Sequence, residues 1–111
     1  MHLYSKAIAS ISWSDIERFC EQGTTENTYL EYKGDFPDDL AKTIAAMANT
    51  FGGLILIGVD ETDAGVPQLP LKGVEVQRGL EERVLNIILD SMTPPAIPEI
   101  ATCLNDTSER A

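Results

Sequence analysis

Charged side chains occur within one short strand-like segment and directly after another. Glu31 and Lys33 alternate with apolar residues, and Asp60 follows the apolar run 54–59. Residues two apart in an extended strand share a face, so Glu31 and Lys33 lie on the same side. The simplest interpretation is a solvated ion pair beside a turn-forming Asp60, because exposed pairs of this kind contribute only about 0–1 kcal/mol.

A third carboxylate, Glu26, precedes this strand and allows a chemical alternative. On an unbroken strand the odd offset would place Glu26 and Glu31 on opposite faces, but a turn between them lets Glu26 fold back. Glu26, Glu31 and Asp60 would then form a hard-oxygen site suited to Mg²⁺ or Mn²⁺. Such an ion supports phosphodiester cleavage by activating water and neutralising phosphate charge. Lys33 would steady the phosphate, and its Glu-x-Lys spacing matches the end of a nuclease motif that is also frequent by chance.

A strand–helix–strand module is predicted to position these residues. Residues 29–33 alternate in polarity like a strand with one buried face, and residues 38–49 repeat apolar side chains at helical spacing. The run 54–59 is typical of a central strand that is covered on both faces. A connection that contains a helix suits a parallel crossover, so Lys33 and Asp60 meet at the same sheet edge. Ligands of open α/β sheets favour that edge, whereas antiparallel strands would separate the two residues.

Two helices are predicted outside the crossover. Ser14 and Glu17 form a capping box that opens a short helix, and Gly23 offers a left-handed stop. A longer helix covers about 75–92 and ends before two prolines. Apolar residues repeat at helical spacing at Leu40, Ile44, Met47 and Ala48 of helix 38–49 and at Phe51 just after it. In helix 75–92 the residues predicted to face inward are Val76, Leu80, Val84, Ile87 and Ile88.

The rest of the chain is assigned to a loop, a strand and a tail. Residues 61–74 are rich in Gly and Pro and predict a loop with a short edge segment. Residues 97–104 predict a last strand. The chain is then one domain, 1–111, with a leading segment and helix at 1–23, a core at 24–104 and a polar, fraying tail at 105–111.

The composition restricts the possible functions. The apolar fraction of 43% is ordinary for a globular protein, and no apolar stretch is long enough to span a bilayer. Cys20 and Cys103 are far apart and predict free thiols in a reducing compartment, so we expect a soluble, cytoplasmic protein. The net charge is −10. A dedicated nucleic-acid binder usually has a basic face, so this charge lowers the expectation of strong autonomous binding to DNA or RNA.

Three segments of the sequence resemble the Schlafen AlbA-type (AlbA_2) domain. They are 26–33 (Glu-Asn-Thr-Tyr-Leu-Glu-Tyr-Lys), 41–53 (Ala-Lys-Thr-Ile-Ala-Ala-Met-Ala-Asn-Thr-Phe-Gly-Gly) and 56–60 (Leu-Ile-Gly-Val-Asp). The family pattern is a Glu, then Glu-Phe-Lys, then an Ala-Asn-Thr-x-Gly-Gly turn, then Ile-Gly-Val-Asp. Tyr32 stands here for the usual Phe. The resemblance covers about 24–104 and implies an α+β (α/β-like) fold, a small sheet with a parallel strand–helix–strand unit and helices packed on it.

The resemblance implies a DNA-binding regulatory module, of the kind found in bacterial proteins beside winged-helix or ATPase-like segments. Similar domains of animal Schlafen proteins carry a carboxylate triad that cleaves tRNA or rRNA. Carried over residue by residue, that triad falls on Glu26, Glu31 and Asp60. The match at Asp60 is the least secure of the three, because Glu61 stands beside it.

Two departures from the family shape the hypotheses. The family domain usually continues with further strands after the position of Ala111, so the chain is either a fragment or receives these strands from a companion domain or a homo-oligomer. Schlafen nucleases also hold RNA in a basic cleft between two lobes, whereas this chain has one lobe and a net charge of −10. Catalysis by the chain alone is therefore not expected.

Three functions remain open. The first is a nucleic-acid-binding regulatory module that contacts phosphates through Lys33 and Lys42. The second is an endoribonuclease that uses Mg²⁺ or Mn²⁺ at Glu26, Glu31 and Asp60. The third is a non-enzymatic domain whose acidic surface meets a protein.

Overall fold

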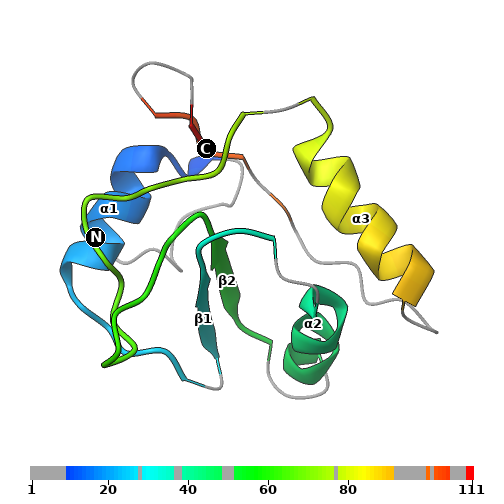
Figure 1. Ribbon diagram of the computed structural model, residues 1–111, viewed down its shortest axis with the longest axis horizontal. Helices are drawn as coiled ribbons and strands as arrows, with labels where there is room; N and C mark the ends of the chain where they lie inside the picture. Colours follow the sequence, from blue (N-terminus) through cyan, green and yellow to red (C-terminus); the bar gives the residue numbers. More distant parts are fainter. Residues whose placement is uncertain are drawn as a thin grey trace.

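The computed structural model shows a small α+β domain with three helices and a two-stranded sheet among the residues that it describes (Figure 1). The elements are α1 (Trp13–Glu21), β1 (Leu30–Lys33), α2 (Leu40–Ala48), β2 (Leu54–Ile57) and α3 (Leu80–Ser91). The described residues are 10–27, 29–36, 39–48, 52–76, 78–91, 100, 102–105 and 110–111.

β1 and β2 are parallel neighbours, as the length of the crossover predicted. Leu30 pairs with Leu54 and Lys33 pairs with Ile57. The other side of β1 is closed by the chain that enters it, because Asn27 forms an antiparallel bridge with Leu30. Because the strands are parallel, both end at the same end of the sheet. The connection between them runs through α2, which lies along one face of the sheet (Figure 1).

The alternation of side chains along the strands divides the core into two parts. Leu30, Tyr32 and Leu56 are buried against Phe19 and Cys20 of α1. On the other face, Ile55 and Ile57 pack against a buried group from α2 and α3, which consists of Leu40, Ile44, Val84 and Ile88. Figure 1 shows α1 on one side of the sheet and α2 and α3 on the other.

The start of α1 differs from the prediction. The capping box is formed by Ser12 and Asp15, and the predicted box at Ser14 and Glu17 is wrong. The main-chain N–H of Ser12 donates to Asp15 Oδ2 at 2.9 Å, and the N–H of Asp15 donates to Ser12 Oγ at 3.3 Å. Both serines begin a Ser-x-x-acid sequence, and the observed helix starts two residues earlier than the predicted one. At the other end of α1, Gly23 follows the C-cap residue Gln22 and has a φ of 68°, as predicted.

α2 agrees with its predicted inward face over most of its length. Leu40, Ile44 and Met47 are buried, whereas Ala48 is exposed and does not belong to that face. Phe51, the last residue of the predicted face, lies outside the described residues, as do residues 38 and 49 of the predicted helix.

α3 begins five residues later than predicted. Gly79 has a φ of 80°, which a helix cannot contain, so the helix starts at Leu80. Val76 lies before it and is 37% exposed, so its predicted inward position is wrong. Val84 and Ile88 are buried as predicted, and Leu80 and Ile87 are half-buried.

The C-terminal region departs most from the prediction. Residues 100 and 102–104 do not form the expected last strand, and residues 97–99 and 101 lie outside the described part. Ala111, expected in a fraying tail, exchanges two main-chain hydrogen bonds with Val74 at 2.6 and 3.0 Å. Glu75 and Arg110 form an antiparallel bridge beside them. Cys20 and Cys103 are free thiols, as predicted.

Candidate functional site

Glu26 folds back onto β1, as the chemical alternative required. The main-chain N–H of Glu26 donates to the carbonyl of Gly65 at 2.8 Å, which fixes the chain before the strand. Glu26 Oε2 then accepts a hydrogen bond from the main-chain N–H of Tyr32 at 3.1 Å. The carboxylate therefore caps the outer edge of β1 and is half-buried there.

Glu31 and Lys33 form the ion pair that their spacing predicted. Lys33 Nζ lies 3.2 Å from Glu31 Oε2, with the two side chains 29% and 23% exposed. This carboxylate oxygen is shielded from solvent. The hydrogen bond with Glu31 is the largest cause of a raised pKa of Lys33, and the negative charges of Asp39 and Glu26 act in the same direction. Lys33 therefore neutralises carboxylates of its own chain.

Asp60 lies where the two strands end, and it has an ion partner that the sequence did not single out. A Cβ atom on Gly34, the residue after Lys33, would collide with Asp60 Oδ1, so the glycine lets this carboxylate approach the end of β1. Asp60 Oδ2 lies 3.7 Å from Lys72 Nζ. Sequence reasoning placed Asp60 at the shared edge but missed Lys72, which comes from the loop that follows β2.

Glu61 joins the carboxylates at β1. Its exposed carboxyl hydrogen-bonds the carboxyl of Glu26, and this contact is the largest cause of a raised pKa of Glu61. The negative charges of Glu26 and Glu31 also raise this pKa, whereas Lys33 lowers it. Glu26, Glu31 and Glu61, called the acidic cluster below, thus surround Lys33. An antiparallel bridge between Glu61 and Pro67 helps to fix the third member.

Comparison with protein families identifies the domain that carries this arrangement. The family model described as "Schlafen, AlbA_2" matches residues 26–109, from the first member of the acidic cluster almost to the end of the chain. This chain belongs to the Schlafen AlbA_2 family. Neither the curated proteins nor the solved structures include a match to it.

Tyr32 has a structural role. Its side chain is buried, and its hydroxyl donates to the carbonyl of Thr24 at 2.6 Å. This bond ties the segment before Glu26 to the strand that carries Glu31. The Tyr32 hydroxyl therefore anchors the acidic cluster.

The carboxylate side chains are suitable ligands for a divalent cation, but their arrangement is less suitable. Carboxylate oxygens are the ligands that Mg²⁺ and Mn²⁺ prefer. Within the described ranges, however, no three His, Cys, Asp or Glu side chains lie in an arrangement that could hold a metal ion. Lys33 lies against Glu31 and Lys72 lies near Asp60, so two of these carboxylates already have a cation of the protein beside them, and Glu26 accepts the main-chain N–H of Tyr32. A metal at Glu26, Glu31 and Asp60 stays a hypothesis.

The cations of this region differ in their availability to an outside ligand. Lys33 is half-buried in its ion pair, whereas Lys42 is exposed on α2. Lys72, which the sequence did not single out, is 51% exposed beside Asp60.

None of the described helices has the length and apolar character needed to cross a membrane.

Proposed function

We propose that this Schlafen AlbA_2 domain is a nucleic-acid-binding regulatory module that acts within a larger assembly or as a dimer. The observation that carries the proposal is the family match over residues 26–109, which includes the shared strand edge and its lysines. Lys33 and Lys42 are the proposed phosphate contacts, and Lys72 is the neighbouring cation that the structure adds. DNA is the first target to test and RNA is the second.

The charge distribution sets the expected strength of this binding. The chain carries a net charge of −10, and Lys33 is already paired with Glu31. Affinity for nucleic acid depends largely on the number of phosphates that lysines and arginines neutralise. We therefore expect weak binding by the isolated domain and stronger binding when a partner domain contributes further cations.

Fluorescence anisotropy with labelled DNA duplexes and single-stranded RNA tests this proposal at several salt concentrations. Lys42→Gln should weaken binding and reduce the slope of log K against log salt by about 0.9 if Lys42 contacts a duplex phosphate. Arg78→Gln, which removes an exposed cation before α3, is the matched control and should change the slope less. Absence of binding at low salt, for both the monomer and any dimer, would contradict the proposal.

The acidic cluster supports a second candidate function, a divalent-metal-dependent endoribonuclease. Three carboxylates gather around one lysine at the end of β1. With Mg²⁺ or Mn²⁺ supplied, the tRNA cleavage that this function predicts should be lost in Glu31→Ala. Asp60→Asn and Glu61→Gln then identify the third carboxylate, since only one of them should abolish cleavage. Cleavage that survives Glu31→Ala comes from a contaminant and ends this candidate.

A further inference from the structure

β2 has one edge that no described residue pairs with. The main-chain N–H of Gly58 donates to the carbonyl of Lys33 at 2.6 Å, so alternate residues of the strand direct their main chain toward β1. Ile55 and Ile57 hold the intervening positions, and their N–H and C=O groups point to the opposite side. In the described part of the chain, β2 is paired with β1 alone.

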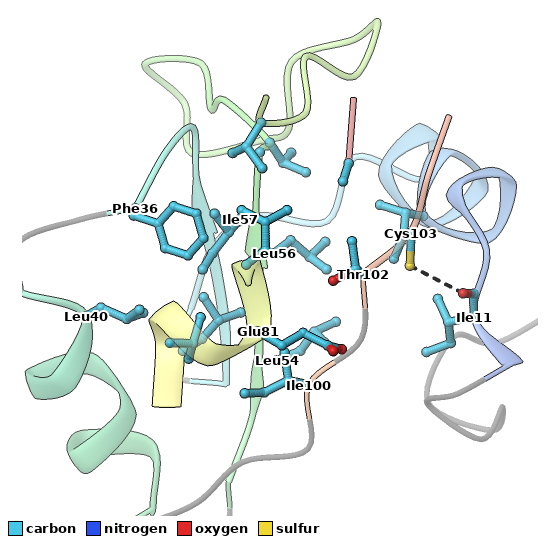
Figure 2. Close-up of a pocket in the computed structure, with 18 of the residues that line it drawn as sticks. Ile11, Phe36, Leu40, Leu54, Leu56, Ile57, Glu81, Ile100, Thr102 and Cys103 are labelled. Carbon is cyan, nitrogen blue, oxygen red and sulfur yellow. Dashed lines mark hydrogen bonds between the residues drawn. The ribbon is translucent and has the colours of Figure 1, made fainter. Parts of the chain in front are cut away.

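A cavity of about 530 Å³ runs beside this open edge. Its far wall is the segment that carries Ile100, Thr102 and Cys103, which Figure 2 shows running alongside β2. The wall on the α1 side includes Ile11, Trp13 and Ile16, and the wall on the other side includes Phe36, Leu80 and Val84. Cys103 is held in place by a hydrogen bond of 3.3 Å from its Sγ to the carbonyl of Ile11.

The lining of the cavity and the unpaired edge of β2 together determine which ligand the cavity can hold. Main-chain N–H and C=O groups beside apolar walls lose their water without gaining a partner, which is unfavourable. An added strand would satisfy the groups of Ile55 and Ile57 and enlarge a sheet that is marginal with two strands. The wall on the α1 side and the wall on the opposite side are both apolar. Both faces of the added strand must therefore be apolar, as in a strand covered on two sides.

Charge selects among the possible strands. Glu81 is the one charged side chain among the described residues that line the cavity, and Glu82 is exposed beside it. Figure 2 shows Glu81 reaching from α3 toward the segment that carries Ile100. The whole chain carries a net charge of −10, which disfavours a second copy and favours a basic partner.

We propose that the cavity beside β2 binds an extended peptide segment, with an aliphatic run flanked by lysine or arginine, as a third strand of the sheet. The aliphatic side chains alternate between the two walls, and the main chain of the peptide bonds to Ile55 and Ile57. The flanking cation lies near Glu81. This interaction is independent of the nucleic-acid proposal, because it uses the opposite edge of the sheet from the acidic cluster.

Titration with the synthetic peptide Lys-Val-Ile-Val-Ile-Lys tests the proposal directly. It should bind several-fold more tightly than Glu-Val-Ile-Val-Ile-Glu, and Glu81→Gln should reduce this preference. N-methylation of the two Val amides or of the two Ile amides provides a second test. Alternate amides of an added strand face β2, so only one of the two methylated peptides should lose binding.

Hydrogen exchange on the complex locates the peptide. Binding should slow the exchange of the Ile55 and Ile57 amides, while the Gly58 amide, already bonded to Lys33, should change much less. Ile57→Pro removes one outward N–H without removing a bond to β1, since proline is tolerated on strand edges. Ile57→Ala keeps that N–H and removes a similar part of the side chain, so it is the matched control and should bind the peptide better than Ile57→Pro.

Three outcomes would overturn the proposal. The first is tight binding of the peptide with no protection of Ile55 and Ile57. The second is equal binding of the lysine-flanked and glutamate-flanked peptides. The third is self-association of the chain that protects the same two amides without peptide, which would make a second copy the occupant. Each readout is made on the folded wild-type chain, so failure of a variant to fold does not affect it.

Discussion

At the scale of single residues, the carboxylates near the end of β1 are distinguished by their partners. Glu31 is paired with Lys33, Asp60 lies near Lys72, and Glu26 accepts the main-chain N–H of Tyr32. Glu61 instead shares a hydrogen bond with another carboxyl group, that of Glu26. One proton between two carboxyl groups stabilises the contact in acid, and its loss leaves two like charges together.

The Glu61 contact predicts a pH-dependent effect on stability. The folded-state pKa of Glu61 is raised, so its favourable contribution is complete below the ordinary pKa and is lost as the pH rises through the raised value. Glu61→Gln can donate to Glu26 at every pH and removes the repulsion at pH 7. We expect it to stabilise the fold at pH 7 by at most about 0.5 kcal/mol, because the site is exposed. The gain should disappear near pH 4.

Urea unfolding of wild type and Glu61→Gln at both pH values measures this effect. Asp63→Asn, which neutralises another exposed carboxylate of the same loop, is the control for net charge. If both variants stabilise the protein equally at pH 7, the effect belongs to the net charge and not to the contact with Glu26.

Tyr32 gives a second prediction at this scale. Tyr32→Phe keeps the aromatic ring but leaves the carbonyl of Thr24 without the hydroxyl that donates to it at 2.6 Å. The loss of one hydrogen bond should reduce the free energy of unfolding by about 1 kcal/mol. Tyr29→Phe removes a hydroxyl from a side chain that is 48% exposed and should have little effect. Thermal denaturation of the two variants compares them, and equal melting temperatures would refute a structural role for the Tyr32 hydroxyl.

At the scale of elements, the capping of α1 can be tested with two neighbouring serines. Ser12→Ala removes the side chain that accepts the N–H of Asp15 and should cost about 1 kcal/mol of stability. Ser14→Ala lies inside the helix and should be neutral or slightly stabilising, since alanine has the higher helix propensity. Urea midpoints of the two variants decide between the caps. A larger loss of stability in Ser14→Ala than in Ser12→Ala would instead support the helix start that the sequence pattern predicted.

Elements that depend on local signals were predictable from the sequence. The parallel pair follows from the length of its crossover, and the end of α1 follows from Gly23. α3 was extended too far because Val76 continues its apolar spacing, although the positive φ of Gly79 interrupts the helix. At the described positions 100 and 102–104 the predicted last strand was wrong, because Ile100, Thr102 and Cys103 line a cavity beside β2 and form no strand. Whether a segment pairs with a distant strand leaves no periodic signal in the sequence.

The candidate site was predictable where its contacts lie within one strand. The pair of Glu31 and Lys33 follows from their spacing, and the return of Glu26 required only a turn. The hydrogen bond of Glu61 and the ion pair of Lys72 depend on how the loop 61–74 folds over the strand ends. Glycine and proline in that loop indicate turns but not their direction. The one sequence signal for Glu61 was its position next to Asp60.

At the scale of the whole molecule, the excess of negative charge acts over its full size. The net charge of −10 is carried by a body of 36 × 30 × 28 Å. The Debye length is about 30 Å at 0.01 M salt and about 8 Å at 0.15 M. At the lower concentration the excess of negative charges gives a net repulsion across the whole molecule, whereas at the higher one only close neighbours interact. This repulsion destabilises the compact state.

Salt should therefore stabilise the fold while it weakens any contact with nucleic acid. We expect the urea midpoint at pH 7 to rise as NaCl increases from about 0.01 M to about 0.15 M, since screening removes the long-range repulsion. Close to the sequence pI of about 4.3 the net charge is small, so the same salt change should have little effect there. A midpoint that is independent of salt at pH 7 would show that local ion pairs, such as Glu31 with Lys33, offset the repulsion. Anisotropy in the same buffers separates the two effects, because phosphate contacts weaken over the range in which the fold gains stability.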